Sequence, residues 1–479
     1  MATNTPHLVI SLFKPGLRPI TVTTTMFFEK ARAEISRSVD LDAVPLRIIA
    51  LPQHENPMIS VIYEEAFGGV WTKLTTKEAI TCALTEQVHP TLDVAPRAVI
   101  MDVRSLLPFA AKPFAFLRQA APGVKIYTWH PSAALSGFYL FGPESLGGRG
   151  NLLAKAEAEA AATGQPFDVV ATEVSIVVVR VPGLPPMYDY EYQPQTMPLP
   201  PPLVSNLFVK AHDIPLKTDG VISMGPEALE PESAAALRKW FGDLSTPVYF
   251  AGPLLPEGEK AATAEKDQSP LGSEIQVFLD RKLQTCGENS ISFGFVFFPL
   301  EPEKFTALLD VVMGQGILFI ISHLSPFAVI PDDLKTRVEE YGHGLLSPWS
   351  PQQTILRHPM SALTPSITRV FATGWFLSHW GFNSALEAIN AGPQNTIHLT
   401  KILDTGYELL EVRTGHGLRP IYRNGKTPSG TVEAVKAEVT DVLKRAFGEE
   451  GEGQEGPSAC AQGAPGCGLG GGGGGVEGC

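Results

Sequence analysis

Cysteine is scarce in this chain, with five residues in 479. An odd and widely spread set of this kind excludes a disulfide framework and indicates a reducing compartment. Basic residues are also in deficit: 37 Lys and Arg stand against 50 Asp and Glu, for a net charge of -13, so we expect no nucleic-acid partner. No segment approaches the ~20 apolar residues that a transmembrane helix needs, and residues 1–13 lack the pattern of a secretory signal. We therefore expect a cytoplasmic protein whose ligands are small molecules.

The length of the chain predicts two domains, because 479 residues exceed what one hydrophobic core usually supports. Between Gly252 and Gly272 the composition turns to Pro, Gly, Lys, Glu and Ala, which is typical of a linker. We place an N-terminal domain at 1–255, the linker at 256–272, a C-terminal domain at 273–447 and a disordered glycine-rich tail at 448–479.

Short apolar runs alternate with helical patterns along most of the chain, which predicts an α/β fold with doubly wound parallel sheets. The expected strands are 7–13, 46–51, 98–103, 125–129, 220–224, 248–251, 291–298 and 317–322. The expected helices are 25–39, 106–120, 152–163, 233–241, 273–283, 303–313 and 332–341. We interpret the proline-rich run 181–202 as a long surface loop, whose tyrosines either pack at the surface or line a pocket.

The residues with the clearest chemical meaning lie between Trp349 and Glu387. A flat indole can stack on a base, and a strand that passes into a helix near residue 384 offers free backbone N–H groups to a pyrophosphate. A carboxylate one turn into that helix can bind ribose hydroxyls. Taken singly, each of these residues has a commoner structural explanation. The candidate set is Trp349, Gln352, His379, Gly381, Asn383, Ser384 and Glu387.

Together these residues resemble the signature of the family 1 UDP-glycosyltransferases, W-x-P-Q, then I-L-x-H, then H-x-G-x-N-S-x-x-E, and the likeness extends from about Pro6 to Glu450. The resemblance implies the GT-B fold, two Rossmann-like domains that face each other across a cleft. It implies a monomer that transfers a hexose from a UDP-sugar to a hydroxyl of a small lipophilic acceptor with inversion, without a metal or other cofactor. The resemblance also implies that Trp349 stacks on uracil, that Gln352 and Glu387 hold ribose, and that His379, Asn383 and Ser384 hold the diphosphate.

The first departure from the family concerns the catalytic base. The family has a Gly-His element after its first strand, whereas residues 14–19 here read KPGLRP, with no histidine. The short spacing to the next strand also leaves no room for a crossover helix. Asp102 matches the aspartate that polarises this base, although a solvated aspartate at a strand end is an equal alternative. His130, after a strand in the first domain, is a less favoured replacement base.

Two further departures lie in the second domain. Residues 361–372 are an insertion within the signature, and 393–398 read PQNTIH where the family has a strand and an Asp-Gln pair that grips the sugar. Asp404 is a less favoured substitute for that pair. An inactive UDP-binding or partner-binding relative is therefore the alternative function. A nicotinamide-dependent enzyme is excluded, because the only glycine cluster near its motif, 147–150, follows no clear strand and lacks the third glycine.

Overall fold

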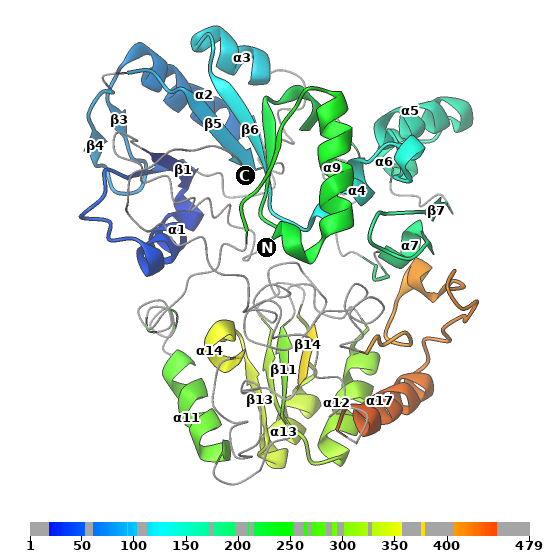
Figure 1. Ribbon diagram of the computed structural model, residues 1–479. Helices are drawn as coiled ribbons and strands as arrows, with labels where there is room; N and C mark the ends of the chain where they lie inside the picture. Colours follow the sequence, from blue (N-terminus) through cyan, green and yellow to red (C-terminus); the bar gives the residue numbers. More distant parts are fainter. Residues whose placement is uncertain are drawn as a thin grey trace, which may run out of the picture.

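The computed structural model describes two groups of elements, one formed by the chain up to residue 252 and one by the chain from residue 271 (Figure 1). The described residues are 19–52, 61–92, 94–102, 113–171, 177–192, 194–196, 209, 215–252, 263, 265, 271–283, 290–294, 301–323, 328–356, 375–378 and 407–447. The predicted strand at 7–13, the segment 14–18 and the tail 448–479 lie outside them. Few residues of the predicted linker are described, so its bounds and those of the domains stay a prediction.

The first group holds two parallel sheets, β1-β2 and β10-β9-β6-β5, with two short antiparallel pairs, β3-β4 and β7-β8. Its strands are β1 (Ile20–Thr24), β2 (Arg47–Leu51), β3 (Ile80–Thr81), β4 (Val88–His89), β5 (Ala98–Asp102), β6 (Lys125–His130), β7 (Val178–Val179), β8 (Met187–Tyr188), β9 (Gly220–Ser223) and β10 (Val248–Phe250). Its helices are α1 (Thr25–Ser38), α2 (Val61–Thr76), α3 (Pro113–Ala120), α4 (Ala134–Phe141), α5 (Leu152–Thr163), α6 (Phe167–Val170), α7 (Asp189–Tyr192) and α9 (Pro231–Asp243).

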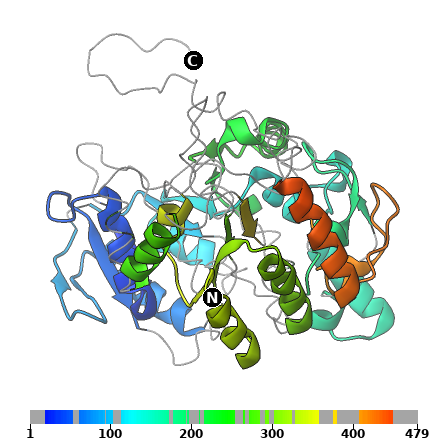
Figure 2. The ribbon, with the colours of Figure 1, turned by 90° about the horizontal axis from the view of Figure 1, so that it is seen from below.

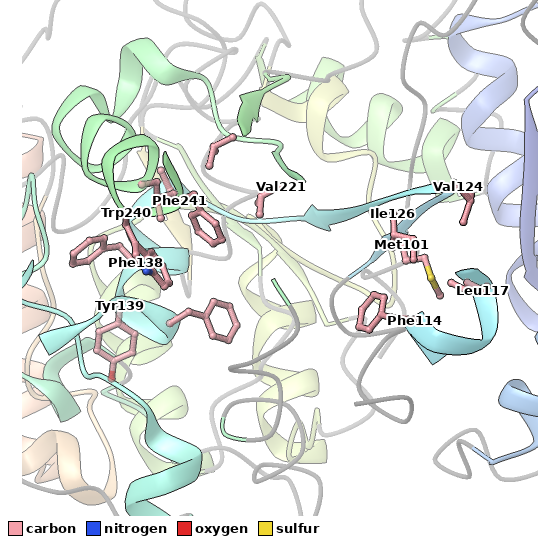
Figure 3. Close-up of a cluster of buried hydrophobic side chains, with 14 of the residues drawn as sticks. Met101, Phe114, Leu117, Val124, Ile126, Phe138, Tyr139, Val221, Trp240 and Phe241 are labelled. Carbon is pink, nitrogen blue, oxygen red and sulfur yellow. The ribbon is translucent and has the colours of Figure 1, made fainter. Parts of the chain in front are cut away.

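The core of the first group forms where helices cover the sheet β10-β9-β6-β5 (Figure 3). Ile126 of β6 is fully buried in this cluster, and Leu117 of α3 lies in the same cluster. Phe138 of α4 meets Trp240 of α9 edge to face, with 6.4 Å between the ring centroids. Aromatic pairs in this geometry add to the stabilisation from buried area, so α4 and α9 are held together over one part of the sheet.

The second group holds one parallel sheet in the order β13-β12-β11-β14. Its strands are β11 (Ser290–Gly294), β12 (Leu318–Ser322), β13 (Gly344–Ser347) and β14 (Trp375–Ser378). Its helices are α11 (Leu271–Leu283), α12 (Pro302–Gly314), α13 (Asp332–Tyr341), α14 (Gln352–Leu356) and α17 (Val432–Ala446). Seen from below, α17 lies beside α12 (Figure 2), and the two helices share one core cluster.

Alternate residues of β12 show that helices cover both faces of this sheet. Leu318 and Ile320 pack in a cluster with α11 and α14, whereas Phe319 and Ile321 pack in a cluster with α12, α13 and α17. Side chains alternate between the faces of a strand, so a run that is apolar at every position must be buried on both sides. This arrangement confirms the predicted α/β fold with a doubly wound sheet.

Most predicted elements that fall on described residues are confirmed. The helices expected at 152–163 and 332–341 have those bounds in α5 and α13. Of the helix expected at 106–120, the part from Pro113 is described, as α3, and residues 106–112 lie outside the described residues. The surface-loop interpretation of 181–202 is wrong for its described part, because β8 and α7 form there and Asp189, Tyr190 and Glu191 are buried. The pattern of alternating tyrosines and acidic residues was too short to show a period, and tertiary contacts bury it.

Candidate functional site

The carboxyl ends of the four strands in the second sheet form one row. The parallel register aligns Gly294 of β11 with Ser322 of β12 on one side and with Ser378 of β14 on the other, and Ser322 with Ser347 of β13. The chain order reverses at β11, because β12 and β13 follow on one side and β14 on the other. Ligands of open α/β sheets bind outside the carboxyl ends of the strands at such a reversal. The row from Ser347 to Ser378 is therefore the candidate binding edge.

Trp349 lies at this edge, two residues after β13. Its backbone N–H donates to Oγ of Ser347 at 3.4 Å, and that hydroxyl also donates to the Trp349 carbonyl. The Trp349 side chain is partly exposed, and Gln352, also partly exposed, begins α14. The two hydrogen bonds form a tight turn that places Trp349 beside the ends of the strands.

Glu265, from the predicted linker, caps the N-terminus of α14. One of its carboxylate oxygens accepts the N–H of Gln353 at 3.1 Å, and the other accepts the N–H of Thr354 at 2.9 Å and its hydroxyl at 2.7 Å. These bonds satisfy N–H groups that a helix cannot pair internally, and the negative charge suits the positive end of the helix. Glu265 is buried, so it fixes where α14 begins.

Arg37 reaches the same short helix from the first group of elements. Its Nη1 donates to both carboxylate oxygens of Glu34 at 3.0 Å, and its Nη2 donates to Oε1 of Gln353 at 3.0 Å. Arg37 and Gln353 are each 6% exposed. The last turn of α1 thus contacts the residue that follows Gln352.

His323 lies between these strand ends, directly after β12. Its backbone N–H donates to the Ser347 carbonyl at 2.9 Å, and its side chain is partly buried. Burial lowers the pKa of His323 below its usual value, so the ring is neutral at pH 7. No feature of the sequence singled this residue out.

The rest of the predicted binding set lies outside the described residues. The structure places Trp349 and Gln352 in the segment that directly follows β13. His379, Gly381, Asn383, Ser384 and Glu387 lie outside, as do the insertion 361–372, the segment 393–398 and Asp404. β14 ends at Ser378, the residue before His379 in the sequence.

The carboxyl edge of the first group contains two of the predicted catalytic candidates. Asp102 is the last residue of β5 and is paired in register with Trp129 of β6. His130 ends β6 and is buried, with Nε2 3.1 Å from the Ala133 carbonyl. The same Nε2 atom is the nearest neighbour of the position where a Cβ on Gly137 would stand, so the His130 imidazole packs closely against α4. The buried imidazole does not support the less favoured interpretation of His130 as a replacement base and agrees with a packing role.

Glu230 is a buried carboxylate at the same edge that sequence reasoning missed. It accepts the N–H of Ala134 at 3.1 Å and of Leu135 at 2.8 Å, and so caps α4. Burial raises the pKa of Glu230 to about 7, although these two hydrogen bonds oppose the shift. Glu230 lies 96 positions after Ala134, at the start of the helix that it caps, so no local sequence pattern indicates this contact.

A further contact joins the two groups near α7 (Figure 1). The hydroxyl of Tyr190 donates to the Pro420 carbonyl at 2.6 Å, and Oε1 of Glu191 accepts the N–H of Tyr422 at 2.9 Å. The segment 194–196 bonds to Thr414 in the same region. The predicted surface loop is therefore an interface between the two halves.

Within the described part of the chain, no helix combines the length and the apolar character that crossing a membrane requires. The same residues include no group of three or more His, Cys, Asp or Glu side chains placed to hold a metal ion.

Known proteins were compared with the chain. No protein-family profile matches the sequence. UDP-glycosyltransferase eriJ of Hericium erinaceus is 33% identical over 306 residues, which cover 60% of this chain and 57% of that protein. UDP-glycosyltransferase 72B1 of Arabidopsis thaliana is 29% identical over 177 residues, 34% of this chain and 33% of that protein. The matches thus span little more than half of these relatives at most.

Solved structures share the fold at lower identity. The chain matches a UGT transferase from Siraitia grosvenorii in complex with UDP with a TM-score of 0.52 and 17% identity, over 91% of this chain and 92% of the other. It matches Phytolacca americana UGT2, complexed with UDP-2fluoro-glucose and pterostilbene, with a TM-score of 0.51, 17% identity and the same coverage. Both comparisons confirm the predicted architecture. The chain is thus similar in sequence to UDP-glycosyltransferases over part of its length, and it has the GT-B fold of the solved ones.

Proposed function

We propose that this chain is a UDP-sugar-dependent glycosyltransferase that transfers a hexose to a hydroxyl of a small lipophilic acceptor with inversion. The observation that carries the proposal is the row of strand ends from Ser347 to Ser378, with Trp349 partly exposed beside it. The relatives named UDP-glycosyltransferase support the reaction class. Phytolacca americana UGT2, a structural neighbour, is complexed with a UDP-sugar analogue and pterostilbene.

The proposed donor site uses the full signature. Trp349 stacks on uracil, and Gln352 and Glu387 accept hydrogen bonds from ribose hydroxyls. His379, Asn383 and Ser384 hold the diphosphate, and the small Gly381 permits close approach of the backbone. The alignment of β14 with β11 supports this assignment, since His379 follows Ser378 at the reversal of the sheet. The UDP-sugar is a substrate, and we propose no further cofactor.

In the proposed reaction the acceptor hydroxyl passes its proton to solvent water, because residues 14–19 supply no histidine base, and its oxygen attacks the anomeric carbon from the face opposite the diphosphate. The bond between that carbon and the β-phosphate oxygen breaks, and UDP leaves with the electron pair. Removal of the proton by a positioned base is typically worth 10²- to 10⁴-fold in rate. Asp102, at the carboxyl end of β5, is the proposed polarising carboxylate, and the histidine that it would polarise is absent from residues 14–19.

UDP binding without transfer is the second candidate function. Residues 14–19 contain no histidine, and His130 is buried against the Ala133 carbonyl. These two observations favour an inactive relative that binds UDP or a protein partner.

A transfer assay separates the two candidates. Purified protein is incubated with UDP-glucose and a panel of phenols and sterols, and the products are analysed by mass spectrometry and by NMR of the anomeric proton. We expect a glucoside of inverted configuration, and less of it from Asp102→Asn. Binding of UDP without any glucoside would instead support the inactive relative.

The cytosol and a monomeric state belong to the same proposal. The low cysteine count supports a reducing compartment, and the resemblance supports a monomer. Light scattering after size-exclusion chromatography tests the second point: a mass near 51.5 kDa is expected, and twice that mass contradicts it.

A further inference from the structure

We propose that Arg37 is a positioning residue for the donor site: from the first half of the molecule it holds α14 and, through α14, Trp349 and Gln352. The inference rests on the proposed function. It begins with the bond from Nη2 of Arg37 to Oε1 of Gln353, which joins residues 316 positions apart.

The helix α14 depends on contacts from outside itself. It spans only five residues, Gln352–Leu356, and helices of this length have little stability of their own. Its apolar side is held through Ile355, which is buried in a cluster with α11 and β12. Its N-terminus is held by Glu265. Arg37 adds a contact on Gln353 that comes from the other half.

The guanidinium of Arg37 is well suited to this task. Glu34, one turn earlier in α1, accepts two hydrogen bonds from Nη1 and so fixes the plane of the group. A planar guanidinium held in this way loses little further freedom when it binds a second acceptor. Arg37 is 6% exposed, and a charge-assisted hydrogen bond away from water is stronger than one between neutral groups.

The position of Gln353 links this contact to the donor. Gln353 follows Gln352 directly, and Trp349 lies three residues before Gln352 at the end of the β13 turn. A shift of α14 therefore moves both proposed donor contacts. The half that we propose to bind the acceptor thereby helps to set the donor site in the other half.

The test measures UDP affinity by calorimetry in wild type, Arg37→Met, Gln353→Met and the double variant. We expect roughly tenfold weaker binding in each single variant, the size of one lost charge-assisted hydrogen bond. The double variant should bind no more weakly than either single one, because both substitutions remove the same bond. Arg32→Met, on the same helix but exposed, is the matched control and should bind as wild type does.

The outcomes separate this inference from the proposed function. If wild type does not bind UDP, the proposed function fails. If wild type binds UDP and both Arg37→Met and Gln353→Met bind equally well, Arg37 is only a structural contact and the inference is overturned. Gln353→Glu gives a second readout. This variant keeps an acceptor for Arg37, so it should bind UDP with wild-type affinity. Weaker UDP binding by the folded Gln353→Glu variant would also contradict the inference. Near-ultraviolet circular dichroism confirms that each variant is folded.

Discussion

At the scale of single residues, Glu230 links burial to a pH dependence. Burial raises its pKa from 4.5 to about 7, which corresponds to about 3 kcal/mol. A carboxyl whose pKa is higher in the folded state contributes stability that is fully present below its unfolded pKa and is lost as the pH rises through its folded pKa. For Glu230 this loss falls between about pH 4.5 and pH 7.

The direction of this pH dependence predicts how the stability of Glu230→Gln should differ from that of wild type. Glutamine keeps an acceptor oxygen for the start of α4 but carries no charge, so it escapes the penalty of a buried carboxylate. Relative to wild type, the free energy of unfolding of the variant should rise by about 3 kcal/mol between pH 4.5 and pH 8. Urea unfolding at several pH values measures the difference. Glu232→Gln, which alters an exposed residue two positions further on, is the control, and a parallel profile for the two variants would refute the argument.

At the scale of elements, Glu265 and Asn151 each cap a helix, but only the helix capped by Glu265 lies beside the proposed donor site. Glu265 caps α14 beside the proposed donor site, whereas Oδ1 of Asn151 accepts the Ala154 N–H and caps α5. Loss of a cap costs about 1 kcal/mol. Glu265→Ala and Asn151→Ala should therefore both lower the free energy of unfolding, but only Glu265→Ala should weaken UDP binding, by up to about fivefold. Calorimetry and urea unfolding on both variants check this, and equal UDP affinities would contradict the role of α14.

The same two helices show how much of the fold the sequence could predict. The bounds of α5 follow from local chemistry, since Asn151 can cap its start and Gly164 adopts φ of 69° at its end. α14 carries no such local signal, because its cap lies 88 residues away in a polar stretch. The parallel, doubly wound character of the second sheet could be expected from alternating apolar runs, and the Trp349 signature from its spacing. Arg37, Glu230 and the interface at α7 could not, because their partners are distant in sequence.

At the scale of the whole molecule, the two halves are joined on more than one side. Arg37 bonds to Gln353 at α14, and Tyr190 bonds to Pro420 near α7. Two separate contacts restrain rotation of one half against the other more than one contact could. The proposed acceptor and donor halves are therefore held in a defined relation, which transfer between two bound substrates requires.

The sequence after Ala391 differs from the family signature, and this difference leads to a prediction about the donor sugar. The family's Asp-Gln pair is absent from 393–398, so we expect the sugar to add little to binding. UDP and UDP-glucose should then have equal dissociation constants in calorimetry. Much tighter binding of UDP-glucose would show that other residues, such as Asp404, grip the sugar.

The most direct test of the donor site is a calorimetric titration of wild type and Trp349→Ala with UDP. The account predicts one UDP per chain for wild type and affinity weaker by about 5- to 150-fold for the variant, because stacking of a base on an aromatic ring is worth about 1–3 kcal/mol. Circular dichroism should show that the variant keeps its fold. Absence of UDP binding to folded wild type, or equal affinity in the folded variant, would contradict the account.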